Sequence, residues 1–146
     1  MTFNWRIRTA AMGIALGGLV LTLAAQSANM FKARLSAVAA DARTRANLAG
    51  SGSVSAKLNG SELTISGEFE GLLWPATKAD LHSAVAAGVR GPTISPLSVT
   101  AAESGMIAGV VSLTPAQLTS LHKGGLYVEI YTQKTPDGVL WGWLLP

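Results

Sequence analysis

Asp80 and His82 are the residues of this sequence whose types and spacing best fit a chemical role. They stand two residues apart in a segment that reads as a strand, so their side chains are expected to point to the same face. Carboxylate oxygens and neutral imidazole are common ligands of divalent first-row metals. A closed metal site needs three or four ligands. The pair therefore gives two hypotheses, a divalent metal site at Asp80 and His82, or structural polar residues on a strand.

Catalytic patterns are otherwise missing from the sequence. It contains no cysteine and no Gly-x-Ser-x-Gly elbow, and no serine and carboxylate arrangement is evident around either histidine. Glu68 and Glu70 flank Phe69 on one strand face, a pattern that is more typical of a solvated edge than of an acid/base pair. No glycine-rich loop is placed to hold a phosphate. We expect no enzymatic activity, no catalytic residues and no organic cofactor.

Tryptophan marks a second kind of candidate site, a surface for a partner. Trp141 and Trp143 alternate with Leu140, Gly142 and Leu144, so both faces of the last strand are apolar. One of these faces is expected to meet something other than water, either a partner protein or lipid. With Trp74, these two tryptophans form the predicted partner-binding set.

The segment from Thr114 to Leu144 carries most of the local signals that position these residues. Thr114, Pro115 and Gln117 predict a capped helix, which Gly124 and Gly125 end. Alternating residues 126–131 predict a strand, Pro136-Asp137-Gly138 predicts a turn, and residues 139–144 return as its partner.

Further strands are predicted upstream, at residues 31–37, 54–58, 63–69, 78–85, 97–99 and 107–113, with a hairpin turn at Asn59-Gly60. Short strands separated by turns predict an all-β fold, an antiparallel Greek-key-like β-sandwich of seven or eight strands with one short helix. A transmembrane helix is expected to precede this domain.

Residues 9–28 contain no charged side chain and follow Arg6 and Arg8, which places residues 1–8 in the cytoplasm. The uncharged run is either a transmembrane signal anchor or a signal peptide cleaved after Ser27. Gly13 and Gly17 would let this helix pack closely against neighbours in lipid, which favours the anchor. Residues 29–146 then form the folded domain outside the cytoplasm.

Charge gives no reason to expect nucleic acid as a partner. The chain has 11 basic and 8 acidic residues. Arg6 and Arg8 account for two of the basic ones, so nine remain against eight in the folded part. The folded part is nearly neutral and has no basic stripe interleaved with aromatic residues.

The order of motifs LTPAQL, GGLYVEIYT and PDGVLWG, together with the upstream strands, resembles the CHRD (chordin-type) domain, which also occurs in many bacterial secreted proteins. The resemblance covers roughly residues 31–145. It implies an extracellular protein-interaction module. Family members usually carry histidines where this chain has Asp80 and Tyr131, and His82 stands at a third such position. These positions imply a metal or polar site, of which this chain keeps one histidine.

These observations lead us to expect a single-pass membrane protein with its amino terminus in the cytoplasm and a CHRD-like domain on the periplasmic or extracellular side. Its expected function is that of a non-catalytic accessory or stabilising subunit. The expected partners are other membrane protein subunits, for example those of a bioenergetic complex such as a photosynthetic reaction centre. The alternative is a secreted domain that binds a metal or small ligand through His82 and its neighbours.

Overall fold

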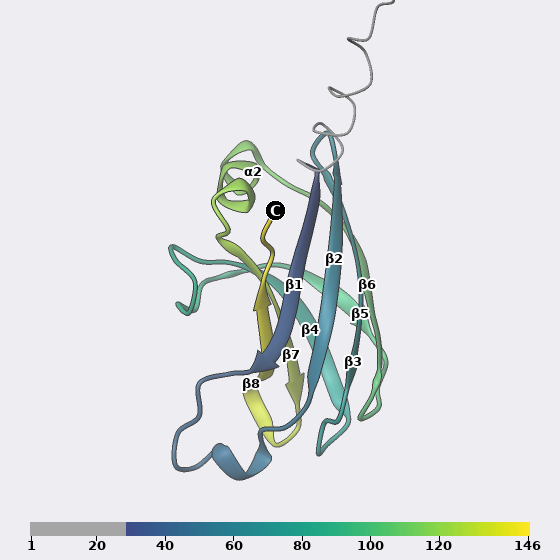
Figure 1. The fold of residues 1–146 in the computed structure, drawn as a ribbon, viewed down its shortest axis with the longest axis vertical. Coiled ribbons are helices and arrows are strands. Elements are labelled where there is room, and N and C mark those ends of the chain that lie inside the picture. Colours follow the sequence, from purple (N-terminus) through teal and green to yellow (C-terminus); the bar gives the residue numbers. More distant parts are fainter. Residues whose placement is uncertain (1–28) are drawn as a thin grey trace, which may run out of the picture.

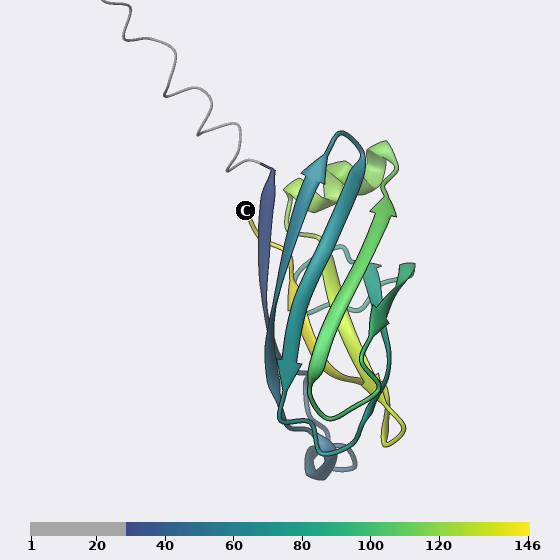
Figure 2. The ribbon, with the colours of Figure 1, turned by 90° about the vertical axis from the view of Figure 1, so that its right-hand side faces the viewer.

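Eight antiparallel strands closed into a barrel make up most of the computed structural model, which describes residues 29–146 (Figures 1 and 2). The strands are β1 (Met30–Ala37), β2 (Ser51–Asn59), β3 (Glu62–Glu70), β4 (Ala76–Ser83), β5 (Thr93–Val99), β6 (Gly105–Ser112), β7 (Leu126–Thr132) and β8 (Thr135–Trp143). A short 3-10 helix, η1 (Arg45–Asn47), and one α-helix, α2 (Pro115–His122), lie in the connections. Around the barrel the order is β1-β2-β3-β6-β5-β4-β7-β8.

The prediction of an all-β antiparallel fold with one short α-helix is confirmed for residues 29–146, but the predicted sandwich is wrong. Two four-stranded halves, β1-β2-β3-β6 and β5-β4-β7-β8, meet at two corners. At the first corner β1 pairs with β8 through Ser36↔Trp141 and Ala37↔Leu140, and the bridge Lys32↔Leu145 continues this pairing just beyond β8. At the second corner β5 and β6 make only two residue pairs, Ser98↔Ala108 and Val99↔Ile107. These seams close the sheet into a barrel. A sandwich and a barrel share the same alternation along each strand, so the sequence pattern did not separate them.

The core is filled from alternate positions of the strands, as the period of two requires. In β1, for example, Phe31, Ala33 and Leu35 point inward and are buried. Strand β7 departs from this pattern, because all seven of its residues are buried. Both of its faces are therefore covered, the inner one by the core and the outer one by other groups described below.

The two predicted turns had different outcomes. A hairpin does connect β2 to β3 where Asn59-Gly60 predicts one, but its two turn residues are Gly60 and Ser61, because Asn59 still pairs with Glu62 as the last residue of β2. Gly60 has φ +63°, where glycine is favoured. Pro136-Asp137-Gly138 is not the turn between β7 and β8, because that turn is made by residues 133–134.

Threonine side chains fix the position of the β7–β8 turn. Thr132 pairs with Thr135, and their hydroxyl oxygens lie 2.7 Å apart. Ile130 pairs with Leu140. Residues 136–139 of β8 therefore lie opposite residue 131 alone, so the Pro-Asp-Gly segment is a bulge within β8.

Residues 1–8 and 9–28, with Gly13 and Gly17, lie outside the described residues, so the predicted anchor and its packing remain predictions. Within residues 29–146, no helix has both the length and the apolar character needed to cross a membrane. The start of β1 lies at the same end of the barrel as α2 and the β2–β3 turn (Figure 1).

Helix α2 has the capping box that its sequence predicts. The Thr114 hydroxyl accepts the amide of Gln117 at 3.2 Å, and the Gln117 side chain accepts the amide of Thr114 at 2.9 Å. Leu121 is buried beneath the helix, and Gly124 follows at φ +72°.

Thr114→Ala is expected to lower the free energy of unfolding by about 1 kcal/mol, because the helix loses its N-cap acceptor. Thr119→Ala is the matched control, since its hydroxyl bonds only the Pro115 carbonyl inside the same helix. Urea unfolding of both variants measures the difference. Equal stability of the two variants would contradict the capping role.

Candidate functional site

The outer face of β4, β7 and β8 carries the polar and aromatic residues that sequence analysis singled out. The alternation that turns Leu81, Val128 and Ile130 into the core turns their neighbours outward. We call these neighbours the outer cluster; its members are Asp80, His82, Tyr127, Glu129, Tyr131, Trp141 and Trp143. Strand register brings them together, with cross-strand pairs Asp80↔Glu129, His82↔Tyr127, Glu129↔Trp141 and Tyr127↔Trp143.

Glu129 lies at the centre of the outer cluster and is completely buried. Arg90, from the loop between β4 and β5, places Nη1 2.6 Å from Oε1 of Glu129. The hydroxyl of Tyr131 donates to Oε2 at 3.0 Å. A buried carboxylate costs several kcal/mol unless it is paired and hydrogen-bonded. Arg90 and Tyr131 supply that compensation.

Asp80 stands directly opposite Glu129 across the β4–β7 pair and is also buried. Two carboxylates at such a position repel each other. Lys78 offsets this repulsion, because its Nζ lies 2.8 Å from Oδ2 of Asp80. The same ammonium lies 4.2 Å from the centre of the Tyr131 ring, a favourable cation–π position. Each acidic group of the cluster thus has its own cation.

His82 has protein partners at both ring nitrogens. Nδ1 lies 3.0 Å from the Gly91 carbonyl oxygen, and Nε2 lies 2.8 Å from the Tyr131 hydroxyl oxygen. A metal ion at His82 would have to displace one of these partners. Among residues 29–146, no group of three or more His, Cys, Asp and Glu side chains is arranged to hold a metal ion. The metal site at Asp80 and His82 stays a prediction.

A stack of rings joins the three strands. His82 stacks on Tyr127 with ring centres 4.8 Å apart, and Tyr127 stacks on Trp143 at 4.9 Å. Trp141 meets Trp143 edge-on at 4.8 Å. The guanidinium of Arg90 lies 5.3 Å from the centre of the Trp141 ring. Both tryptophans remain half-buried, so this stack also forms part of the surface.

The structure does not bring Trp74 to the other two tryptophans. Trp74 lies in the β3–β4 connection, exposed, with Lys134 of the β7–β8 turn 5.4 Å from its ring. This is the end of the barrel opposite to α2 (Figure 1). The predicted set of three is therefore one pair on the side of the barrel and one separate residue.

Sequence reasoning missed Glu129 and Arg90. The available signal was the pattern Tyr127-x-Glu129-x-Tyr131, a carboxylate between two aromatic residues on one strand face. Arg90 gave no signal, because it lies in a loop whose path over β7 is set by tertiary contacts. Gly91 in the same loop is bonded by its amide to the Tyr127 hydroxyl oxygen at 3.1 Å.

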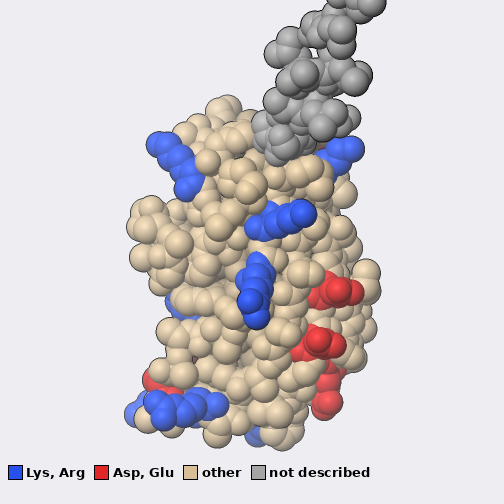
Figure 3. All heavy atoms as spheres, in the orientation of Figure 1, with Lys and Arg blue, Asp and Glu red and all other residues tan. Residues whose placement is uncertain are grey.

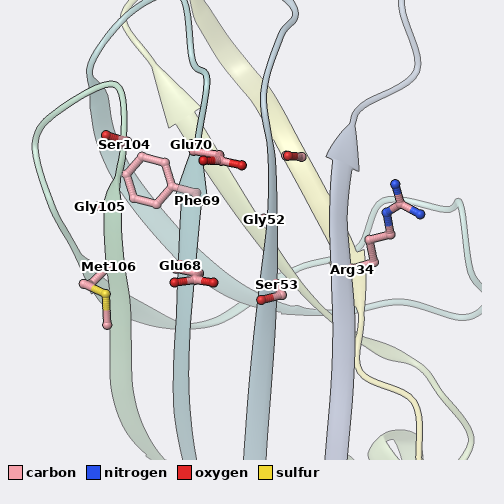
Figure 4. A pocket seen from close by; sticks show the side chains of 10 residues that line it. Arg34, Gly52, Ser53, Glu68, Phe69, Glu70, Ser104, Gly105 and Met106 are labelled. Carbon is pink, nitrogen blue, oxygen red and sulfur yellow. The ribbon is translucent and has the colours of Figure 1, made fainter.

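A separate groove of about 460 Å³ lies on the outer face of the other half of the barrel (Figure 4). A cross-strand row, Arg34↔Ser53↔Glu68↔Met106, crosses it from β1 to β6. Glu68 and Glu70, the carboxylate pair noted in the sequence, both line it. The groove is open and is lined largely by serine, glycine and glutamate residues, so it offers a polar surface.

Gly138→Ala is expected to disturb the outer cluster. Gly138 has φ +108°, and a Cβ there would collide with the carboxylate of Glu129. The positive φ alone costs an alanine about 1–2 kcal/mol, and displacement of Glu129 adds to this. Gly88→Ala is the matched control, because Gly88 has φ +81° and open space around it. Thermal unfolding should show the larger loss for Gly138→Ala, and equal losses would contradict the contact.

Both tyrosines of the chain lie in the cluster, which permits a direct titration. Burial, reinforced by the negative charge of Glu129, raises the pKa of Tyr131 above its usual value of 10. Burial also raises the pKa of Tyr127. Folded protein is therefore expected to show little phenolate absorbance at pH 10, and unfolding in urea should increase it.

The sign of the accompanying stability change follows from these raised values. The folded state holds the phenol protons of both tyrosines more tightly than the unfolded state does. Their contribution to the free energy of unfolding is therefore complete below pH 10 and is lost as the pH rises further. Ordinary phenol titration in the folded protein would contradict the burial of these hydroxyls.

Comparison with known proteins identifies the family of this chain. No curated protein and no solved structure matches the chain. A match to a known family covers residues 31–144, which run from the first core residue of β1 to the end of the barrel. The chain belongs to the CHRD domain family.

Proposed function

We propose that this CHRD domain is a non-catalytic interaction module, anchored in a membrane by residues 9–28 and held outside the cytoplasm. In this proposal it acts as an accessory or stabilising subunit of a larger membrane assembly. Several features support it: the uncharged run of residues 9–28, the positive charges of Arg6 and Arg8 before that run, and a barrel whose reactive groups are internally bonded.

The observation that carries the proposal is the half-buried pair Trp141 and Trp143 on the outside of β8, beside an apolar loop. Arg90 packs over Trp141 at 5.3 Å, and its neighbour in the loop, Val89, is 43 % exposed. Tryptophan and arginine are enriched in the central residues of protein interfaces. This combination gives an amphipathic surface that a partner protein would cover.

The outer cluster supports a binding role for this surface over a catalytic one. Glu129 is bonded to Arg90 and Tyr131, and His82 is bonded at both nitrogens. A general acid or base needs a free position within hydrogen-bond reach of a substrate. The same bonds make the tryptophan surface rigid, which lowers the entropy lost on binding.

Membrane anchoring would strengthen a modest contact. A tethered domain meets a partner in the same membrane at a high effective concentration, so a small surface suffices. The expected partners are accordingly other membrane subunits.

The test is extraction of the native protein in mild detergent, with its intact mass and the size of its particle both measured. We expect the full-length mass inside a large particle. Val89→Asp should release the protein from that particle, because a carboxylate would be buried in the contact. Met106→Asp, a change at a 60 % exposed residue of the opposite face, is the matched control and should stay in the particle.

A mass lacking about 27 residues, as cleavage after Ser27 would give, in a small soluble particle would contradict the proposal. Identical particles for wild type and Val89→Asp would contradict the placement of the contact surface.

A further inference from the structure

Positive charge is concentrated at the end of the barrel where the described chain begins. Lys57 pairs in register with Met30, the first residue of β1, and Lys32 follows two residues later. Lys123 caps the end of α2. Glu62, just after the β2–β3 turn, is the acidic residue at this end among those described. Figure 3 shows this on one face, where the charged groups in the upper half are all Lys or Arg and the acidic groups lie lower.

The same end exposes apolar side chains between these lysines. Met30, Leu145 and Val110 are 37 %, 52 % and 62 % exposed. Met30 and Val110 lie in one cross-strand row, Met30↔Lys57↔Thr64↔Val110. An alternation of basic and apolar groups on one surface is typical of proteins that lie on anionic lipid.

The short link between residues 9–28 and β1 limits how far the α2 end of the barrel can be from a bilayer that contains those residues. Asn29 alone separates the uncharged run of residues 9–28 from Met30. One residue spans at most about 3.6 Å. A membrane that contains the run therefore lies close to the lysines of the α2 end.

We propose that the α2 end of the barrel lies directly on the anionic phospholipid surface of the membrane that holds residues 9–28. Lys32, Lys57 and Lys123 face the headgroups, and Met30, Val110 and Leu145 contact the interface. This inference rests on the proposed anchoring. It fixes the orientation of the barrel, with the tryptophan surface on the side and Trp74 at the end away from the membrane.

Because the chain has no cysteine, single introduced cysteines can report this orientation in the full-length protein. Val110→Cys and Met106→Cys form a matched pair, since both residues point outward from β6 and are 62 % and 60 % exposed. They lie four residues apart, about 13 Å along the strand. Each variant is labelled with an environment-sensitive fluorophore and reconstituted in vesicles of phosphatidylcholine and phosphatidylglycerol that contain headgroup-labelled nitroxide lipid.

We expect quenching of the label at position 110 to be several-fold stronger than at position 106. The difference should shrink in pure phosphatidylcholine vesicles. It should also shrink when salt rises from about 0.01 M to about 1 M, which shortens the Debye length from about 30 Å to about 3 Å. Lys57→Glu should reduce quenching at position 110, and Lys134→Glu, at the other end of the barrel, should leave it unchanged.

The experiment distinguishes failure of the proposed orientation from failure of the proposed anchoring. Protein that remains in the vesicles with equal quenching at both positions, or with quenching at position 110 that ignores salt and lipid charge, overturns this inference and leaves the anchoring intact. Protein that does not associate with the vesicles overturns both.

Discussion

The buried carboxylate of Glu129 is the constraint around which the outer cluster is built. It lies on the outer face of β7, opposite a second buried carboxylate, and would be prohibitively costly there without Arg90 and the Tyr131 hydroxyl. Arg90 can reach it only if the β4–β5 loop folds back over the sheet. Gly138 must lack a side chain at the same point, because a Cβ would occupy the position of the carboxylate. The path of the β4–β5 loop and the glycine at position 138, which together cover the outer face of β7 at this point, are both required by the Glu129 carboxylate.

Local signals in the sequence were sufficient for most of the elements. The β2–β3 hairpin and the Thr114 capping box depend on residues within a few positions of one another, and both appear in the structure, the hairpin with its turn one residue later than predicted. The closure of the barrel depends on two seams for which alternation gives no signal, one between the first and last strands, β1 and β8, and one of only two residue pairs between the neighbouring strands β5 and β6. The Pro136-Asp137-Gly138 turn was wrong for a similar reason, because the Thr132–Thr135 pairing moved the turn and converted this segment into a bulge.

The candidate site was predictable only in part. Strand periodicity placed Asp80 with His82, and Trp141 with Trp143, on shared faces, but it could not show that all four belong to one face of three adjacent strands. The role of Tyr131 also became visible only through its contacts with His82 and Glu129. These bonds join the members of the cluster beneath the tryptophan surface, which connects the chemistry of the site to the interaction role that we propose.

Hydrogen exchange of the β4–β5 loop tests the central claim, that the Glu129 charge holds this loop on the sheet. Glu129→Gln keeps the shape of the side chain and removes its charge, and Glu68→Gln, at an exposed carboxylate, is the control. We predict faster exchange at Val89 and Gly91, whose amides bond Ala86 and the Tyr127 hydroxyl, with unchanged exchange in β2 and β3. Unchanged exchange of the loop in Glu129→Gln would contradict the account.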